Sequence, residues 1–394
     1  MSLDLPLIDC DTHCFETRDA CTRYLPKKYA DQAIAPIRLP NGQEVILAGT
    51  ELALFASDNG IGFDTAYRPG SLKQMLKEMA SGSPDENYQT EPMRPEYVER
   101  EPRLKLMDEQ GVERAVVFPA GIAMAAEACV RDTGALYANL RAYNRWYDET
   151  WGFNYHDRIY ASALISLRDL DRAVEEVEFI LERNARVVLL QAGPAYGRSP
   201  GDPYFDPVWS RLNEAGVIVA FHINDRWYNE VIAPHWGLRP NPPAWRMSAW
   251  QWHNLIGEQP LMQTLSSLIF DNVFGRFPNL KVLCAEFGCE WLPHFLKLLD
   301  KSRGMGRNGP WIGGKLPARP SRVFAEKIRV VPYPEDDIES VVQALGGADM
   351  IVMGSDFPHA EGLAEPGEFK GLIKGLDDSA QEAILRHNGL VLLS

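Results

Sequence analysis

Short apolar runs recur along the chain, and amphipathic segments with the spacing of helices separate them. This alternation predicts βαβ units with a parallel sheet. The runs are rich in Val, Ile and Leu, as expected for strands that are buried on both faces. Eight such runs are present, at residues 5–9, 114–119, 159–166, 187–191, 217–223, 280–287, 328–332 and 350–354.

Eight strands that alternate with helices favour a single α/β domain over residues 1–394, a (β/α)₈ TIM barrel, over an open doubly wound sheet. No glycine-rich phosphate loop follows the first run, which argues against a dinucleotide-binding fold. The predicted helices lie at residues 104–110, 133–151, 170–183, 207–214, 260–277, 291–302 and 336–345.

Two predicted insertions interrupt this alternation. The first, at about residues 14–100 after strand 1, contains an alternating stretch at residues 37–47 around Asn41-Gly42, which predicts a β-hairpin. The second, at about residues 224–258 after strand 5, holds half of the ten tryptophans. Its five members are Trp227, Trp236, Trp245, Trp250 and Trp252.

Composition narrows the function classes. The net charge of −14, with Lys and Arg interspersed, opposes binding to nucleic acid or to an anionic membrane surface. There is no apolar run of membrane-spanning length, and the first residues lack the pattern of a signal peptide. None of the six cysteines forms a C-x-x-C pair. We therefore expect a reduced, cytoplasmic protein whose partner is a small-molecule substrate.

Candidate metal ligands follow the predicted strands, at the end where TIM barrels carry their chemistry. Asp11 and His13 are two residues apart and share one face of an extended strand. His222 ends strand 5, and Asp356 follows strand 8. Each has a structural alternative, such as a turn cap, a buried histidine with a hydrogen-bond partner, or a helix N-cap. Together they predict an imidazole–carboxylate site for one divalent cation, zinc first and manganese second.

A single metal ion is the simpler expectation, because strand 4 (residues 187–191) carries no lysine that could bridge two ions as a carbamate. Four ordered motifs then resemble the amidohydrolase superfamily, in particular its branch of TIM-barrel enzymes with aminocarboxymuconate-semialdehyde decarboxylase. They are I-D-C-D-T-H-C-F-E (8–16), V-A-F-H-I-N-D (219–225), C-A-E-F-G-C-E-W-L-P (284–293) and M-G-S-D-F-P-H (353–359). The resemblance implies that Asp11, His13, His222 and Asp356 bind the metal.

One position departs from that branch. Its decarboxylases usually have a proton-handling histidine at the end of strand 6, where this chain has Glu286. Glu286 could transfer a proton, or it could only orient a ligand. His359, three residues after Asp356, could contact the substrate or cap the last helix. Glu16 could orient the His13 imidazole or begin the insertion as a solvated carboxylate.

The tryptophan-rich insertion lies directly after His222, so Trp227 could form a wall of the pocket. Arg226 or Arg246 could hold a substrate carboxylate. Alternatively, the same residues form a surface between the subunits of a homodimer.

The leading functional hypothesis is metal-dependent hydrolysis of a small, carboxylate-bearing substrate, with Asp356, Glu286 and His359 moving protons. Non-oxidative decarboxylation of an aromatic or muconate-like acid is the close alternative. A hydratase is a third enzymatic option, and a barrel that binds a ligand without catalysis belongs to another class.

Overall fold

Parallel strands form the centre of the protein in the computed structural model. The structure describes residues 5–40, 44–52, 63–74, 90–121, 126–223, 226–240, 242 and 246–394. The side chains of residues 226 and 227 are not part of this description. Two sheets have the orders β1-β7-β8 and β9-β10-β11-β12-β13, and all their pairings are parallel. Only Ser162 separates β8 from β9. The strands are β1 (Leu7–Cys14), β7 (Val112–Pro119), β8 (Ile159–Ala161), β9 (Ala163–Leu164), β10 (Val187–Leu189), β11 (Ile218–His222), β12 (Lys281–Ala285) and β13 (Ile328–Val330).

The predicted eighth strand, at residues 350–354, takes a less regular form. It makes a parallel bridge from Ile351 to Val330 of β13, and Phe357 makes another to Thr12 of β1. The amide of Met353 instead donates to the carbonyl of Ile384, outside both sheets. Because this amide does not pair with a neighbouring strand, the segment forms isolated bridges rather than a regular strand. It nevertheless lies between β13 and β1.

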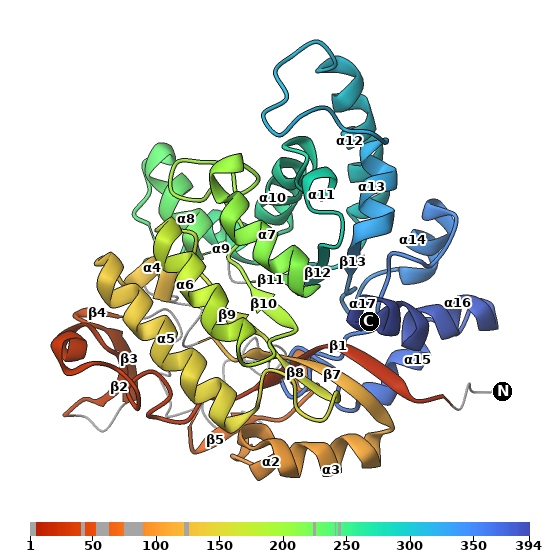
Figure 1. Cartoon of the computed structure of the whole chain (residues 1–394). Coiled ribbons are helices and arrows are strands. Elements are labelled where there is room, and N and C mark those ends of the chain that lie inside the picture. Colours follow the sequence, from red (N-terminus) through yellow and green to blue (C-terminus); the bar gives the residue numbers. More distant parts are fainter. Residues whose placement is uncertain are drawn as a thin grey trace.

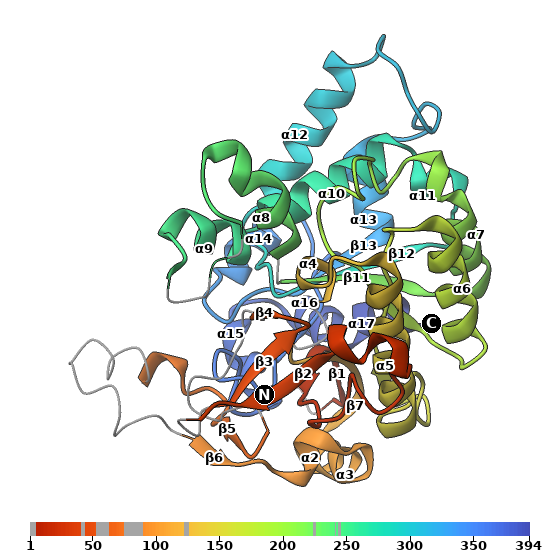
Figure 2. The same ribbon diagram turned by 90° about the vertical axis from the view of Figure 1, so that its left-hand side faces the viewer.

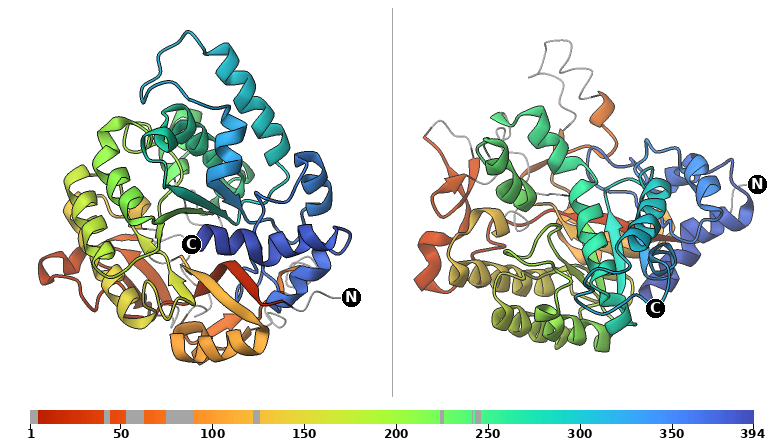
Figure 3. Two further views of the ribbon diagram at one scale, coloured as in Figure 1. Left: turned by 45° about the vertical axis from the view of Figure 1, so that its right-hand side comes forward. Right: turned by 90° about the horizontal axis from the view of Figure 1, so that it is seen from above.

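Helices alternate with these strands and cover them on the outside (Figure 1; Figure 3, left). Their inward faces are apolar; α6, for example, buries Ala173, Val177 and Ile180. The element order and the parallel pairing are those of an α/β TIM barrel. The covering helices are α3 (Arg100–Gln110), α5 (Thr133–Thr150), α6 (Leu170–Leu181), α7 (Asp206–Ala215), α10 (Gln259–Phe270), α11 (Val273–Arg276), α12 (Leu292–Met305), α13 (Pro320–Lys327) and α14 (Ile338–Leu345), followed by α15 (Phe369–Leu372), α16 (Asp378–Glu382) and α17 (Asn388–Leu393).

Additional elements follow β1. The strands β2 (Ile34–Arg38) and β3 (Glu44–Ala48) pair antiparallel, as the alternation around Asn41-Gly42 predicts, although residues 41–43 of the turn lie outside the described part. The strand β4 (Glu51–Leu52) pairs with β3, and β5 (Thr65–Tyr67) pairs with β6 (Thr90–Pro92). The short helices α2 (Pro95–Val98) and, after β7, α4 (Ala126–Cys129) are also present.

The segment after β11 forms helices. The helices α8 (Arg226–Ile232) and α9 (Ala249–Ile256) pack against each other (Figure 2), and the 3₁₀ helix η3 (Ala233–Trp236) lies between them in the chain. Ser248 caps α9, since its hydroxyl accepts a hydrogen bond from the amide of Gln251. None of the helices in the described ranges is long and apolar enough to span a membrane.

Candidate metal centre

The predicted ligands come from separate elements that end at the same side of the barrel. Asp11 and His13 belong to β1, and His222 is the last residue of β11. Asp356 lies in the segment between β13 and β1. All four side chains are buried, with between 0% and 8% of their surface exposed. The carboxyl ends of the strands thus bring together residues that are up to 345 positions apart, 356 minus 11.

The donor atoms form two adjoining triads that share His13. Candidate ligand atoms of Asp11, His13 and His222 lie within 4.8 Å of one another, and so do those of His13, Asp356 and His359. His13 Nε2 is 3.1 Å from His222 Nε2 and 3.2 Å from Asp356 Oδ1. Asp11 Oδ1 is 3.6 Å from His13 Nε2 and 3.5 Å from His222 Nε2. Nitrogen and oxygen donors therefore converge on one point.

Backbone carbonyls set the direction of both imidazoles. His13 Nδ1 lies 3.1 Å from the carbonyl oxygen of Pro119, and His222 Nδ1 lies 3.0 Å from that of Ile223. A carbonyl accepts only from a protonated Nδ1, so each ring in its neutral form presents an Nε2 lone pair to the cluster. Histidines that bind metal ions are typically held through their other nitrogen in this way.

The acidic surroundings favour a cation. Burial alone would keep His13 neutral, but the carboxylates of Asp11 and Asp356 raise the pKa of its imidazolium to about 10. Burial opposes ionisation of Asp356, yet His359 and His13 lower the pKa of its carboxyl group below the ordinary value. Asp11 Oδ1 and Asp356 Oδ1 are buried without a hydrogen-bond donor among the described residues. Two imidazole nitrogens and two such oxygens fit a first-row divalent cation.

Residues that the sequence did not single out hold this arrangement. The buried Asp9 accepts hydrogen bonds from the hydroxyl and the amide of Ser355, at 2.6 and 3.0 Å, and so fixes the residue before Asp356. Gly354 allows a close approach, since a Cβ there would lie 2.6 Å from Asp11 Cβ. The only sequence signal for Asp9 is its place two residues before Asp11, on the same face of an extended strand.

Arg103 holds the end of β1 through a hydrogen bond to its backbone. This guanidinium is buried and donates to the carbonyl oxygen of His13 at 2.7 Å and to that of Glu96 at 2.7 Å. Burial lowers its pKa to about 10, although several nearby acidic groups raise it. In the sequence, Arg103 lies in a polar stretch of the kind found in surface helices. The sequence therefore did not indicate that its side chain is buried.

Glu286 and His359 both lie beside the candidate ligands. Glu286 Oε2 is 3.2 Å from His222 Nε2, and its backbone has the positive φ of 58° that is uncommon outside glycine. Tyr333 holds this turn, since its hydroxyl donates to the carbonyl oxygen of Glu286 at 2.6 Å. His359 stacks on His13 with 3.9 Å between ring centroids, and its Nδ1 is 3.0 Å from Asp356 Oδ1. Both residues can exchange a proton within the site.

A cavity of about 200 Å³ opens above these residues, and His13, His222, Glu286 and His359 reach it. Glu361 also lines this cavity, and its carboxylate lies within 4.8 Å of candidate ligand atoms of Glu286 and Asp356. No sequence motif indicated Glu361. Burial, followed by the charges of Asp356, Glu361 and Asp11, raises the pKa of Glu286 well above that of an ordinary glutamate.

The other predicted residues are placed differently. The side chains of Arg226 and Trp227 lie outside the described part, and Arg246 is exposed and does not line the cavity. Trp252 of α9 does line it. Glu16 is buried, and its charge raises the thiol pKa of Cys14 and Cys21, after the effect of burial. The hydrogen-bond partner of His13 Nδ1 is the Pro119 carbonyl rather than Glu16.

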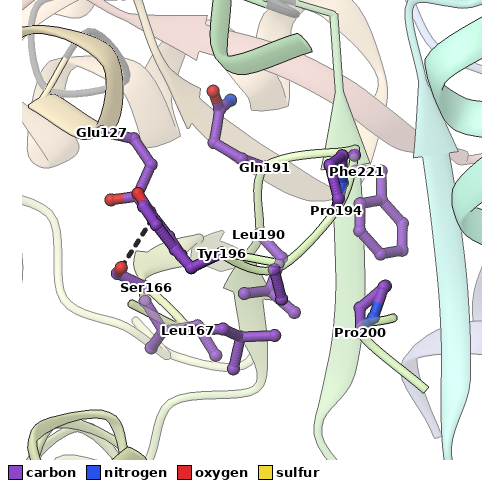
Figure 4. Close-up of a pocket in the computed structure, with 12 residues that line it drawn as sticks. Glu127, Ser166, Leu167, Leu190, Gln191, Pro194, Tyr196, Pro200 and Phe221 are labelled. Carbon is purple, nitrogen blue, oxygen red and sulfur yellow. Dashed lines mark hydrogen bonds between the residues drawn. The ribbon is translucent and has the colours of Figure 1, made fainter. Parts of the chain in front are cut away.

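A second, smaller cavity lies beside β9 and β10 (Figure 4). Glu127, Ser166 and Tyr196 contribute polar groups to it, and the Ser166 hydroxyl donates to Glu127 Oε1 at 2.6 Å. Its volume of about 20 Å³ is enough for roughly one water molecule. This cavity therefore cannot hold an organic substrate, and the cavity above His13 and His222 is the candidate substrate site.

Comparisons with known proteins agree with this geometry. The amidohydrolase family model matches residues 8–393. An amidohydrolase from Mycobacterium avium subsp. paratuberculosis K-10 has 33% identity and a TM-score of 0.84, with 100% of this chain and 98% of that chain covered. No curated protein matches the sequence.

Two manganese-bound decarboxylases share the fold at lower identity. The 5-carboxyvanillate decarboxylase of Novosphingobium aromaticivorans DSM 12444 has a TM-score of 0.60 and 15% identity, with 99% of this chain and 97% of that chain covered. The dihydroxybenzoic acid decarboxylase of Polaromonas sp. JS666 has a TM-score of 0.56 and 17% identity, with 82% and 93% covered. Since the family model spans nearly the whole sequence, the chain belongs to the amidohydrolase family of enzymes.

Proposed function

We propose that the protein is a metal-dependent hydrolase of a small organic substrate. The observation that carries this proposal is the convergence of two imidazole Nε2 atoms and two buried carboxylate oxygens without donors, beside a cavity of about 200 Å³ that both imidazoles line. Asp11, His13, His222 and Asp356 would hold the cation. A bound divalent cation supplies Lewis acidity, which polarises a carbonyl group and lowers the pKa of water. Zinc suits these donors best, and manganese is the second choice.

The chain's own residues would move the protons. Asp356 would accept a proton from the attacking water, and His359, whose Nδ1 is 3.0 Å from Asp356 Oδ1, would pass a proton toward the leaving group. Glu286 Oε2 lies on the other side, next to His222. The apolar wall around Trp252 and Leu255 would limit the access of bulk water to the reacting groups.

Decarboxylation remains the second candidate, because one observation favours it. Burial raises the pKa of Glu286 well above the ordinary glutamate value, which favours the protonated form of a carboxyl group that could protonate the carbon that loses carbon dioxide. The solved structures of decarboxylases support only the common fold, since their identity to this chain is 15% and 17%.

The first test is elemental analysis of protein purified without chelators, for wild type and for His222→Ala. About one zinc or manganese ion per chain in the wild type, lost in the variant, supports the proposal. A wild type without metal, and without affinity for added zinc or manganese, would refute it and favour a barrel that only binds a ligand.

The reaction type needs a second experiment. The metal-loaded enzyme would be screened against esters, lactones, amides and aromatic acids in ¹⁸O-labelled water. Incorporation of ¹⁸O with cleavage of an ester, lactone or amide bond indicates hydrolysis, whereas release of carbon dioxide without incorporation indicates a carboxy-lyase. Asp356→Asn should remove both the activity and the metal, so a metal-free but active variant would contradict the site.

A further inference from the structure

The outer part of the cavity above the candidate metal ligands is apolar. Trp252, Leu255 and Ile256 face it from α9, and Ile223 follows β11. Trp252 has 36% of its surface exposed and Ile256 has 54%, so both have apolar area that a ligand could cover. An indole ring beside two branched aliphatic side chains favours a flat or bulky apolar group.

The polar residues of the cavity are of only two kinds. The five that line it are His13, His222, Glu286, His359 and Glu361. Among the described lining residues there is no Lys, Arg, Ser, Thr, Asn or Gln. Beyond the cation, the imidazoles and the indole N–H of Trp252, the described part of the cavity therefore offers a substrate carboxylate acceptors rather than donors. An N–H or ammonium group would meet the acceptor oxygens of Glu286 and Glu361.

The charge balance leads to the same result. The carboxylates of Asp11 and Asp356 together balance the two positive charges of a divalent cation. The carboxylate of Glu361 then remains as an additional negative charge, and candidate ligand oxygens of Glu361, Glu286 and Asp356 lie within 4.8 Å of one another. A ligand bound beside these groups would feel their negative charge. An anionic ligand would be repelled and a cationic ligand attracted, even when solvent screens part of the interaction.

Glu361 is available for such a contact. It is exposed, it lines the cavity, and no Lys or Arg of the described chain lies within ion-pair distance of it. Glu286 differs, because its carboxylate already contacts His222 at 3.2 Å. An exposed carboxylate at a cavity wall can accept a hydrogen bond from a ligand without first losing a protein partner.

We infer that the substrate is an uncharged or cationic molecule with an apolar body, and that Glu361 selects it by accepting a hydrogen bond from an N–H or ammonium group near the reacting carbonyl. This inference rests on the proposed function, since it concerns the same cavity. It differs from the carboxylate-bearing substrate expected from the sequence, for which Arg226 or Arg246 would hold the carboxylate. Glu361 acts here as a specificity-determining residue.

Three probes with the same benzyl and hydroxamate groups test this inference, because the hydroxamate chelates the cation and only the α-substituent changes. Phenylalanine hydroxamate carries an ammonium group, 3-phenylpropanohydroxamate carries hydrogen, and the monohydroxamate of benzylmalonate carries a carboxylate. Their affinities for the zinc-loaded full chain would be measured by calorimetry, below the pKa of the amine.

In the wild type, we expect the ammonium probe to bind about tenfold or more tightly than the carboxylate probe. Glu361→Gln should reduce this ratio to about threefold or less, since one charge and its acceptor are lost. Glu368→Gln is the matched control, because Glu368 is also exposed but does not line the cavity, and it should keep the wild-type ratio.

Equal or tighter binding of the carboxylate probe by the wild type would overturn the inference. If Arg226→Ala then removed the preference for the carboxylate probe, Arg226 would be the residue that binds the carboxylate. An unchanged ratio in Glu361→Gln would also overturn it. Failure of the proposed function looks different, because the uncharged hydroxamate would then fail to bind and the wild type would retain no metal.

Discussion

Gly354 offers a direct test of the close packing behind the metal centre. In Gly354→Ala the new Cβ would lie 2.4 Å from Val331 Cγ1 and 2.6 Å from Asp11 Cβ, where ordinary contacts begin at 3.4 Å. Asp11 would have to move by 3.4 minus 2.6, or 0.8 Å. Metal–ligand distances tolerate only about 0.2 Å. The crowding should lower the free energy of unfolding by about 1–3 kcal/mol and weaken metal binding by about 10–100-fold.

Zinc affinity would be measured by competition with a chromophoric chelator, and stability by urea unfolding of the metal-free chain, so that the two effects are separated. Gly347→Ala is the control, because nothing lies within 4 Å of its new Cβ. A Gly354→Ala protein that loses stability but binds zinc within about twofold of the wild type would refute the reasoning, because Asp11 could then not be a ligand held by this contact.

Three further changes give distinct results. Arg103→Met removes the guanidinium donor from the buried carbonyl oxygen of His13 and from the partly buried one of Glu96, and urea unfolding should show a loss of about 2–4 kcal/mol; a loss below about 1 kcal/mol would contradict this. His359→Gln should keep the metal by elemental analysis but lower kcat by about 100-fold, because Asp356 loses its proton partner; unchanged turnover would remove His359 from the reaction. Burial raises the pKa of Glu127, so the folded state retains the proton more strongly and wild-type stability falls as the pH rises above the ordinary glutamate value; Glu127→Gln should therefore gain in stability relative to the wild type as the pH rises through this range, and a difference independent of pH would argue against it.

The sequence predicted the barrel well because its strands must be apolar on both faces. Runs such as 187–191 and 217–223 contain the observed β10 and β11, and helix ends agree to within a few residues. The segment at 350–354 does not form the regular strand that its apolar run predicts. The amide of Met353 donates to the carbonyl of Ile384, and Gly354 packs closely against Asp11. Such exchanges of ladder bonds for other contacts depend on tertiary packing and leave no periodic signal.

The site was predictable only where the chemistry sits at a strand end. Asp11, His13 and His222 satisfy that rule, and the structure brings them together. Glu361 and Arg103 do not satisfy it, because their positions depend on how a loop and a helix fold back. For the second insertion, Arg246 is exposed, whereas residues 252, 255 and 256 reach the cavity. Their i, i+3, i+4 spacing was the available signal for the inward face of α9.

The acidity of the site is the strongest argument for a cation there. Asp11, Asp356, Glu286 and Glu361 converge, and no Lys or Arg in the described ranges forms an ion pair with any of them. Buried carboxylates without partners are costly, and in a purely structural role they would be paired. Here the nearby groups of the described chain that can carry a positive charge are imidazoles. The carboxylates of Asp11 and Asp356 raise the pKa of the His13 imidazolium to about 10. A site that stabilises a proton on a fully buried imidazole would stabilise a divalent cation more strongly, because the same carboxylates would then face two charges.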